Sequence, residues 1–246
     1  MISLEENNNI YFVTLENSPV NALSLGFVSE LSLLVEEIAK KESTRALLFN
    51  SSLNHFCAGA DLKERSSMSD GESINTVYTL KTFFSSIYSL PFPTISLING
   101  ACMGGGLELA LSCDFRIAAD NAFFALPESK LGIIPGAGGT QLLPRIIGIQ
   151  EAKKLIYSGL KIDSEYALKV GLIDEVCKVK NLKENGEKLV KSFLSSSKHS
   201  IKASKTCINE GFNMDIKSSL NIEFREYIQT LDTDERKEAL RKYKKN

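Results

Sequence analysis

Apolar runs of strand length alternate with helically spaced apolar residues along the first 180 positions. Residues 10–15, 45–49, 94–98, 115–118, 122–125 and 172–176 form short apolar runs bounded by turn residues, which predicts strands. Apolar residues recur every three to four positions in 24–40, 74–90, 104–112, 151–157 and 164–170, which predicts helices. Such alternation is typical of an α/β core. The polar, Gly71-containing segment 66–73 is the best candidate for a mobile loop.

The strand pattern stops after about residue 181. From there on, apolar residues such as Leu189, Phe193, Leu220 and Phe224 recur at helical spacing. We therefore expect a core in residues 1–180 that carries the functional site, and a helical region in residues 181–246. An amphipathic layer outside a closed core needs a partner surface, which is either a neighbouring copy of the chain or the chain's own core.

Composition and charge narrow the class of protein. The 246 residues are 43% hydrophobic and 24% charged, with a formal net charge of −1, as in ordinary globular proteins. This charge disfavours a generic nucleic-acid binder, and no apolar run approaches the roughly 18 residues that a membrane span needs. The N-terminus resembles neither a signal nor a transit peptide, so we expect a cytoplasmic location. The five cysteines are scattered and there are two histidines, which predicts reduced thiols and no metal site.

Several familiar catalytic motifs are missing. The sequence contains no phosphate-binding loop, and the glycine run at 104–106 does not complete a dinucleotide fingerprint because Leu109 stands where the last glycine belongs. Neither His55 nor His199 lies near a nucleophile elbow. Nucleophilic hydrolase chemistry is therefore disfavoured.

Two isolated carboxylates stand in apolar segments. Glu108 is the one charge in the segment 98–113 and follows three glycines. Burial would raise its pKa, and bare N–H groups at the start of a helix can bind an oxyanion. Glu128 lies between Pro127 and further apolar residues, so two buried carboxyls could share acid and base work. Each also has a simpler interpretation: Glu108 reaches solvent beside a glycine packing contact, and Glu128 begins a helix.

A third element is the small-residue stretch from Cys57 to Asp61, in which small side chains let a backbone N–H approach a ligand. A tight turn before a helix capped by Asp61 would explain the same residues. The segments 55–64, 99–110, 126–128 and 131–145 occur in this order. Together they closely resemble the enoyl-CoA hydratase/isomerase (crotonase) family over the chain from about residue 10 onward.

The resemblance implies a fold, an assembly and a reaction. The fold would be a spiral of ββα units with a C-terminal helical trimerisation region, in a homotrimer or a hexamer of two trimers. The reaction would be syn hydration of a 2-enoyl-CoA without metal or redox cofactor, since CoA is part of the substrate. The N–H groups of Ala58 and Gly105 would form the oxyanion hole, Glu108 would deprotonate the attacking water, and Glu128 would protonate C2. The CoA contacts match Ala58, Ala60, Asp61, Leu62, Tyr243 and Lys244.

Local motifs are most similar to the methylglutaconyl-CoA hydratase branch, shown by 59–68 together with 104–114. Some members of this branch bind RNA through a lysine-rich first helix. Here the corresponding stretch 24–42 has two lysines and four glutamates, so the RNA function is not carried over. Two departures stand out. Residues 16–22 are short and lack a basic residue before Asn21. At the C-terminus Tyr243 matches the family's aromatic residue, but the lysine position meets Asn246, so that Lys244 or Lys245 would have to substitute; a frayed basic tail would also explain these residues. The rival reaction is Δ3-Δ2-enoyl-CoA isomerisation, which needs one glutamate.

Overall fold

A six-stranded sheet forms the centre of the molecule. The computed structural model describes residues 1–241 and residue 243. In spatial order the strands are β1 (Ile2–Asn7), β2 (Ile10–Leu15), β3 (Ala46–Ser51), β4 (Thr94–Ile98), β6 (Phe115–Ala119) and β9 (Glu175–Cys177). β1 pairs antiparallel with β2, and all other neighbours are parallel. The carboxyl ends of the parallel strands therefore meet at one edge, where α/β proteins place ligands.

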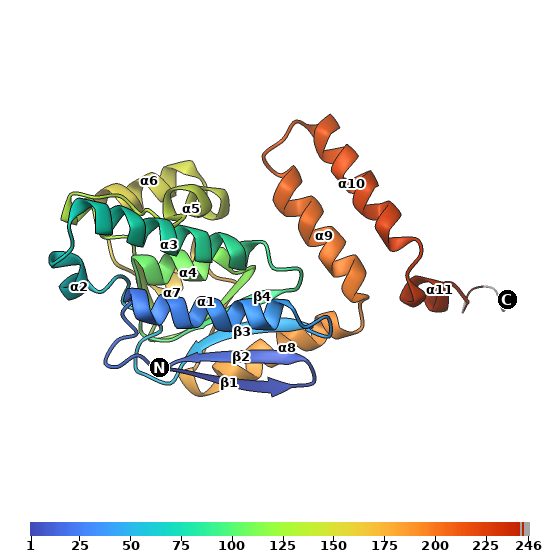
Figure 1. Cartoon of the computed structure of the whole chain (residues 1–246), viewed down its shortest axis with the longest axis horizontal. Helices are drawn as coiled ribbons and strands as arrows, with labels where there is room; N and C mark the ends of the chain where they lie inside the picture. The colour runs from blue at the N-terminus through green and yellow to red at the C-terminus, as the bar shows by residue number, and fades with distance from the viewer. Residues whose placement is uncertain (242, 244–246) are drawn as a thin grey trace.

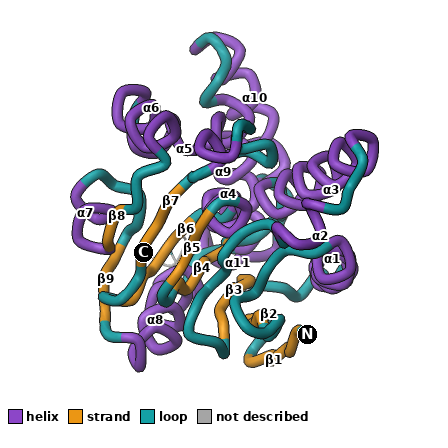
Figure 2. The backbone as a smooth tube through the Cα atoms, turned by 90° about the vertical axis from the view of Figure 1, so that its left-hand side faces the viewer, coloured by secondary structure: helices purple, strands orange, loops and turns teal. Residues whose placement is uncertain are grey.

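Helices cover both faces of this sheet (Figure 2). One face is covered by α1 (Leu25–Ala39), α2 (Leu62–Ser66), α3 (Asp70–Tyr88) and α4 (Gly105–Ser112). It encloses the main apolar core, in which the side chains of Phe27, Phe49 and Phe84 are almost fully buried. The opposite face is covered by α8 (Leu182–Leu194), whose Leu182 and Val190 pack with strand residues such as Phe12.

A smaller three-stranded sheet extends the core beside α4. It contains β5 (Ala101–Met103), β7 (Phe123–Ala125) and β8 (Ile162–Asp163), in that order. The chain between residues 128 and 181 also forms short 3-10 helices, η1 (Glu128–Leu131) and η2 (Val179–Asn181), and the α-helices α5 (Gly139–Ile147), α6 (Ile149–Ser158) and α7 (Ser164–Lys169). β5 leads directly into α4, so this sheet determines where α4 begins.

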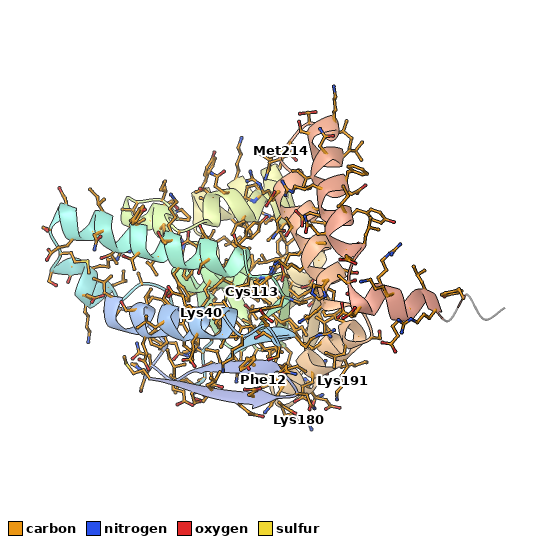
Figure 3. The ribbon with its side chains drawn as sticks, turned by 45° about the vertical axis from the view of Figure 1, so that its right-hand side comes forward. Phe12, Lys40, Cys113, Lys180, Lys191 and Met214 are labelled. Atoms are coloured by element: carbon orange, nitrogen blue, oxygen red, sulfur yellow. The ribbon has the colours of Figure 1, made fainter. Side chains whose placement is uncertain are left out.

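The last three helices lie beside the core. They are α9 (Lys198–Gly211), α10 (Ile216–Thr230) and α11 (Asp234–Arg241). α9 and α10 run side by side, with Met214 at the turn between them and α11 extending farther out (Figures 1 and 3). An ion pair of 2.7 Å between Lys205 Nζ and Asp114 Oδ2, only slightly exposed, ties α9 to the start of β6.

The structure corrects several details expected from the sequence. The predicted mobile loop at 66–73 is wrong in its second half, because α3 begins at Asp70. A capping box, in which Ser69 Oγ accepts from Glu72 N–H and the Glu72 carboxylate accepts from Ser69 N–H, starts this helix. The first helix after residue 180, α8, lies in the core rather than in a separate layer. β1, β5 and β8 were not predicted.

Candidate active site

Two loops at the carboxyl edge of the sheet build the site. One follows β3 and the other follows β4, and they pair as a short parallel ladder. Phe56 N–H donates to Asn99 O at 2.7 Å, Cys57 N–H to Ala101 O at 3.0 Å, and Met103 N–H to Cys57 O at 3.0 Å. This ladder brings the small-residue stretch 57–61 against the glycines 104–106.

The expected oxyanion donor at Ala58 is wrong, because its N–H is already used. It donates to the Val20 carbonyl at 3.0 Å. Ala60 forms a parallel bridge with Leu23, in which the neighbours make the hydrogen bonds: Leu23 N–H donates to Gly59 O, and Asp61 N–H to Leu23 O. In this geometry the N–H of Ala60 points away from Leu23, and it has no acceptor in the described part of the chain.

Ala60 and Gly105 offer the pair of N–H groups that the site needs. A Cβ on Gly105 would lie 3.8 Å from Ala60 N and 3.0 Å from Leu23 Cδ1. Gly59 joins the two segments: it has φ +97°, and a Cβ there would lie 3.3 Å from Gly105 N and 2.7 Å from Met103 O. A side chain at Gly59 would therefore force the two donors apart.

The Glu108 carboxylate is buried and held as an acceptor. The residue is 4% exposed, and its Oε1 accepts from Ala137 N–H at 2.8 Å and from Gly139 N–H at 2.9 Å. Burial raises the pKa of Glu108, whereas these two hydrogen bonds and the charge of Arg65 act to lower it. The alternative in which Glu108 reaches solvent is therefore wrong.

Glu128 is buried as well, but it is hydrogen-bonded differently. It begins η1, as the simpler interpretation proposed, but it is also buried, and its Oε2 has no hydrogen-bond partner among the described residues. Its other carboxyl oxygen lies 3.0 Å from where a Cβ on Gly104 would be. Burial and the nearby Glu108 charge raise its pKa to about 7, against the lowering effect of its own peptide N–H.

The two carboxyls are thus brought together and made chemically different. Two N–H groups favour the ionised form of Glu108, whereas Glu128 Oε2 has no donor among the residues that the structure describes. Burial raises the pKa of both carboxyls, and the two hydrogen bonds at Glu108 oppose that rise. A pair of titratable groups whose environments separate their pKa values is an acid–base pair.

The remaining residues expected to contact CoA do not all gather here. Asp61 caps α2, accepting from Lys63 and Glu64 N–H, and Leu62 follows with 60% exposure. Tyr243 is 81% exposed and follows α11 in the sequence. α11 lies at the opposite end of the molecule from α2 (Figure 1). Lys244 lies outside the described residues.

Apolar side chains border the two segments that enclose the carboxyls. Ile74 and Tyr78 on α3 and Ile133 and Ile134 after η1 are all more than half exposed. The segments meet where a Cβ on Gly136 would lie 2.7 Å from Val77 Cγ1. α3 and the segment after η1 thus share an exposed apolar surface.

Sequence reasoning missed the residue that organises the entry to the site. Asn21 is fully buried with φ +54°. Its Nδ2 donates to Ser51 Oγ and to the carbonyls of His55 and Phe56, and its Oδ1 accepts from Asn17 N–H. It therefore fixes the loop after β2 against the loop after β3. The dipeptide Asn21-Ala22 was the available signal.

Comparison with known proteins shows the family of this chain. The family model for enoyl-CoA hydratase/isomerase matches residues 5–246. The chain belongs to this family. It is 39% identical over 251 residues to human mitochondrial methylglutaconyl-CoA hydratase, covering 98% of this chain and 73% of the relative. It is also 39% identical to the Mycosarcoma maydis enoyl-CoA isomerase/hydratase fer4, covering 97% and 90% of the two chains.

The fold prediction is confirmed by a solved relative. The crystal structure of an enoyl-CoA hydratase from Bacillus anthracis matches with a TM-score of 0.95 at 36% identity, over 99% of this chain and 96% of that chain.

Among the described residues, no helix is long and apolar enough to span a membrane. In the same part of the chain, no group of three or more His, Cys, Asp or Glu side chains is placed to hold a metal ion.

Proposed function

We propose that the protein hydrates a 2-enoyl-CoA to the 3-hydroxyacyl-CoA. The observation that carries this proposal is the pair of buried carboxyls, of which Glu108 accepts from two backbone N–H groups, beside the N–H groups of Ala60 and Gly105. An enoyl thioester needs both elements: donors for the carbonyl oxygen as enolate character develops, and an acid–base pair for the elements of water.

In the proposed reaction the thioester oxygen accepts from the N–H groups of Ala60 and Gly105. Glu108, ionised, takes a proton from the water that adds to C3. Glu128, protonated, gives its proton to C2 on the same face of the double bond, so the addition is syn. All bonds that change belong to substrate, water and the two carboxyls, and the proposed reaction therefore requires no metal or redox cofactor.

The assay is spectrophotometric. Hydration of crotonyl-CoA removes the absorbance of the conjugated enoyl thioester, and we expect this loss with the purified protein. A panel with longer 2-enoyl-CoA and methylglutaconyl-CoA then ranks the acyl groups. Both are included because the relatives comprise an enoyl-CoA isomerase/hydratase and a methylglutaconyl-CoA hydratase. Absence of hydration with every member would contradict the proposal.

Isomerisation is the second candidate. The Mycosarcoma maydis relative is named an isomerase/hydratase, and a 3-enoyl-CoA substrate tests it directly, since isomerisation creates the conjugated absorbance. The presence of both carboxyls favours hydration, because a proton shuttle between C2 and C4 needs one. RNA binding is disfavoured by the acidic first helix, and an RNA shift assay at low and high salt tests it.

We also propose that the chain assembles as a trimer or hexamer and that Tyr243 contacts the CoA of a neighbouring copy. α9, α10 and the turn between them expose large apolar side chains, among them Ile208, Phe212, Ile216 and Phe224, each at least 65% exposed. Tyr243 follows α11, which extends away from the core (Figure 1). A cytoplasmic location stays a prediction.

A further inference from the structure

A histidine side chain, rather than a backbone carbonyl, accepts a hydrogen bond at the start of β5, the strand that leads to the glycines 104–106. His55 Nδ1 accepts a hydrogen bond from Ala101 N–H at 3.1 Å. The backbone carbonyl of His55 is already used, because it accepts from Ser51 Oγ at 2.7 Å and from Asn21 Nδ2 at 3.1 Å. The imidazole therefore supplies the acceptor for the first N–H of β5, ahead of the Phe56–Met103 ladder.

The ring is closely packed against this strand. Gly100 has φ +55°, and a Cβ there would lie 2.6 Å from His55 Nδ1. On β7, Phe123 contacts the ring edge-on with 6.2 Å between the ring centroids, and Phe123 is the register partner of Ala101. The imidazole thus contacts both strands that determine where β5 begins.

The hydrogen bond also fixes the form of the imidazole. Nδ1 can accept from Ala101 only when it carries no proton, so the proton of the neutral ring is on Nε2. His55 is half-buried and lines a polar cleft together with Asn54 and Lys180, so Nε2 can donate to water there. The side chain acts here as an acceptor at one defined atom.

β5 is short, and its C-terminal end leads to Gly105, whose N–H is one of the two proposed oxyanion donors. Ala101 begins the strand, Met103 ends it, and Gly105 follows two residues later. At the end of the strand, Gly104 N–H donates to Ala125 O at 2.9 Å. A shift at Ala101 has only three residues over which to be absorbed before it reaches Gly105 N–H.

We propose that His55 is a positioning residue for the oxyanion hole: its Nδ1 holds the start of β5 and so sets the place of the Gly105 N–H. This inference rests on the proposed function. Because an oxyanion donor acts mainly in the transition state, losing the His55 acceptor lowers kcat more than it raises KM. Loss of a whole donor costs about 10²–10³-fold in kcat, and displacing one costs less, about tenfold.

Three substitutions test the acceptor at its defined atom. His55→Leu removes the acceptor, His55→Asn restores one at the δ position, and His55→Gln moves it one bond farther out. We expect about a tenfold fall in kcat for the leucine variant with KM changed less than about twofold, and recovery to within about threefold in the asparagine variant. The glutamine variant should behave like leucine. Asn54→Leu is the control, since it removes an exposed polar side chain from the same loop, and its kcat should be unchanged.

A second measurement does not depend on turnover. Amide hydrogen exchange in segment 101–106 should be faster in His55→Leu than in wild type and should return to the wild-type rate in His55→Asn. Wild-type kcat or exchange in the leucine variant, or no recovery with asparagine, would overturn the inference. If His55→Leu does not fold, the comparison of asparagine with glutamine decides it. If wild type hydrates no 2-enoyl-CoA, the proposed function fails while the exchange data still judge the link between His55 and β5.

Discussion

Burying Glu128 is expected to make its own contribution to stability smaller at alkaline pH than at acidic pH. Its pKa is about 7 in the folded protein against 4.5 for an ordinary glutamate. The folded state therefore holds this proton over a pH range in which the unfolded chain has lost it. Stability falls as the pH rises from about 4.5 to 7, because the ionised form is disfavoured inside the fold.

The magnitude follows from the two pKa values. At 1.36 kcal/mol per pH unit, the gap between 4.5 and about 7 corresponds to roughly 3 kcal/mol. Glu128→Gln removes the titration and keeps the shape of the side chain. We therefore expect the variant to exceed wild type in free energy of unfolding by about 3 kcal/mol more at pH 8.5 than at pH 4.5.

Urea denaturation at these two pH values measures this difference, with protomer concentration held fixed because assembly also contributes to stability. Glu165→Gln is the matched control, since Glu165 is an exposed carboxylate on α7. The control should shift stability equally at both pH values. Parallel curves for Glu128→Gln and wild type would mean that Glu128 titrates like a surface carboxyl, and its role as the acid would then have no electrostatic basis.

Four further outcomes are expected. Glu108→Gln and Glu128→Gln should each keep the circular dichroism of wild type and lose at least about 10²-fold in crotonyl-CoA hydration; near-normal turnover would remove that residue from the mechanism. Gly105→Val should lose about 10²-fold in kcat, because its side chain enters the space of Leu23 and Ala60 N. Arg65→Leu should move the acidic limb of the kcat/KM profile to higher pH, because the Arg65 charge lowers the pKa of Glu108. Light scattering should give three or six times 27.1 kDa, and truncation at 195 should give aggregates or weakly active monomers; a fully active monomer would refute the shared site.

Local patterns predicted the elements that bury their own apolar residues. The helix after Ser24 begins as expected, with the Ser24 side chain accepting from Phe27 N–H. The strand β1 was missed because its residues are mostly exposed and it exists only by pairing with β2. The signal was present: Asn8 and Asn9 both have positive φ and form a two-residue turn between the paired strands.

The oxyanion donor could not be chosen from the sequence. Ala58 and Ala60 are both small residues in one stretch, and a backbone N–H leaves no mark on residue type. The choice depends on Leu23 and Val20, far along the chain: Val20 O occupies the Ala58 N–H, and the bridge to Leu23 turns the Ala60 N–H toward the site. The role of His55 is hidden in the same way, because it arises from pairing with Ala101.

The electrostatic order of the two carboxyls also explains how the proposed cycle returns to its start. After hydration Glu108 holds the proton taken from water and Glu128 is ionised. That arrangement is unfavourable, because Glu108 then carries a proton while two N–H groups point at its Oε1, and Glu128 carries a charge at a buried oxygen without a donor. We therefore expect the proton to return to Glu128 through product or water. The burial that disfavours ionised Glu128 would therefore keep this carboxyl protonated before the reaction and favour its reprotonation afterwards. This gives a reason for a buried carboxyl oxygen that has no donor among the described residues.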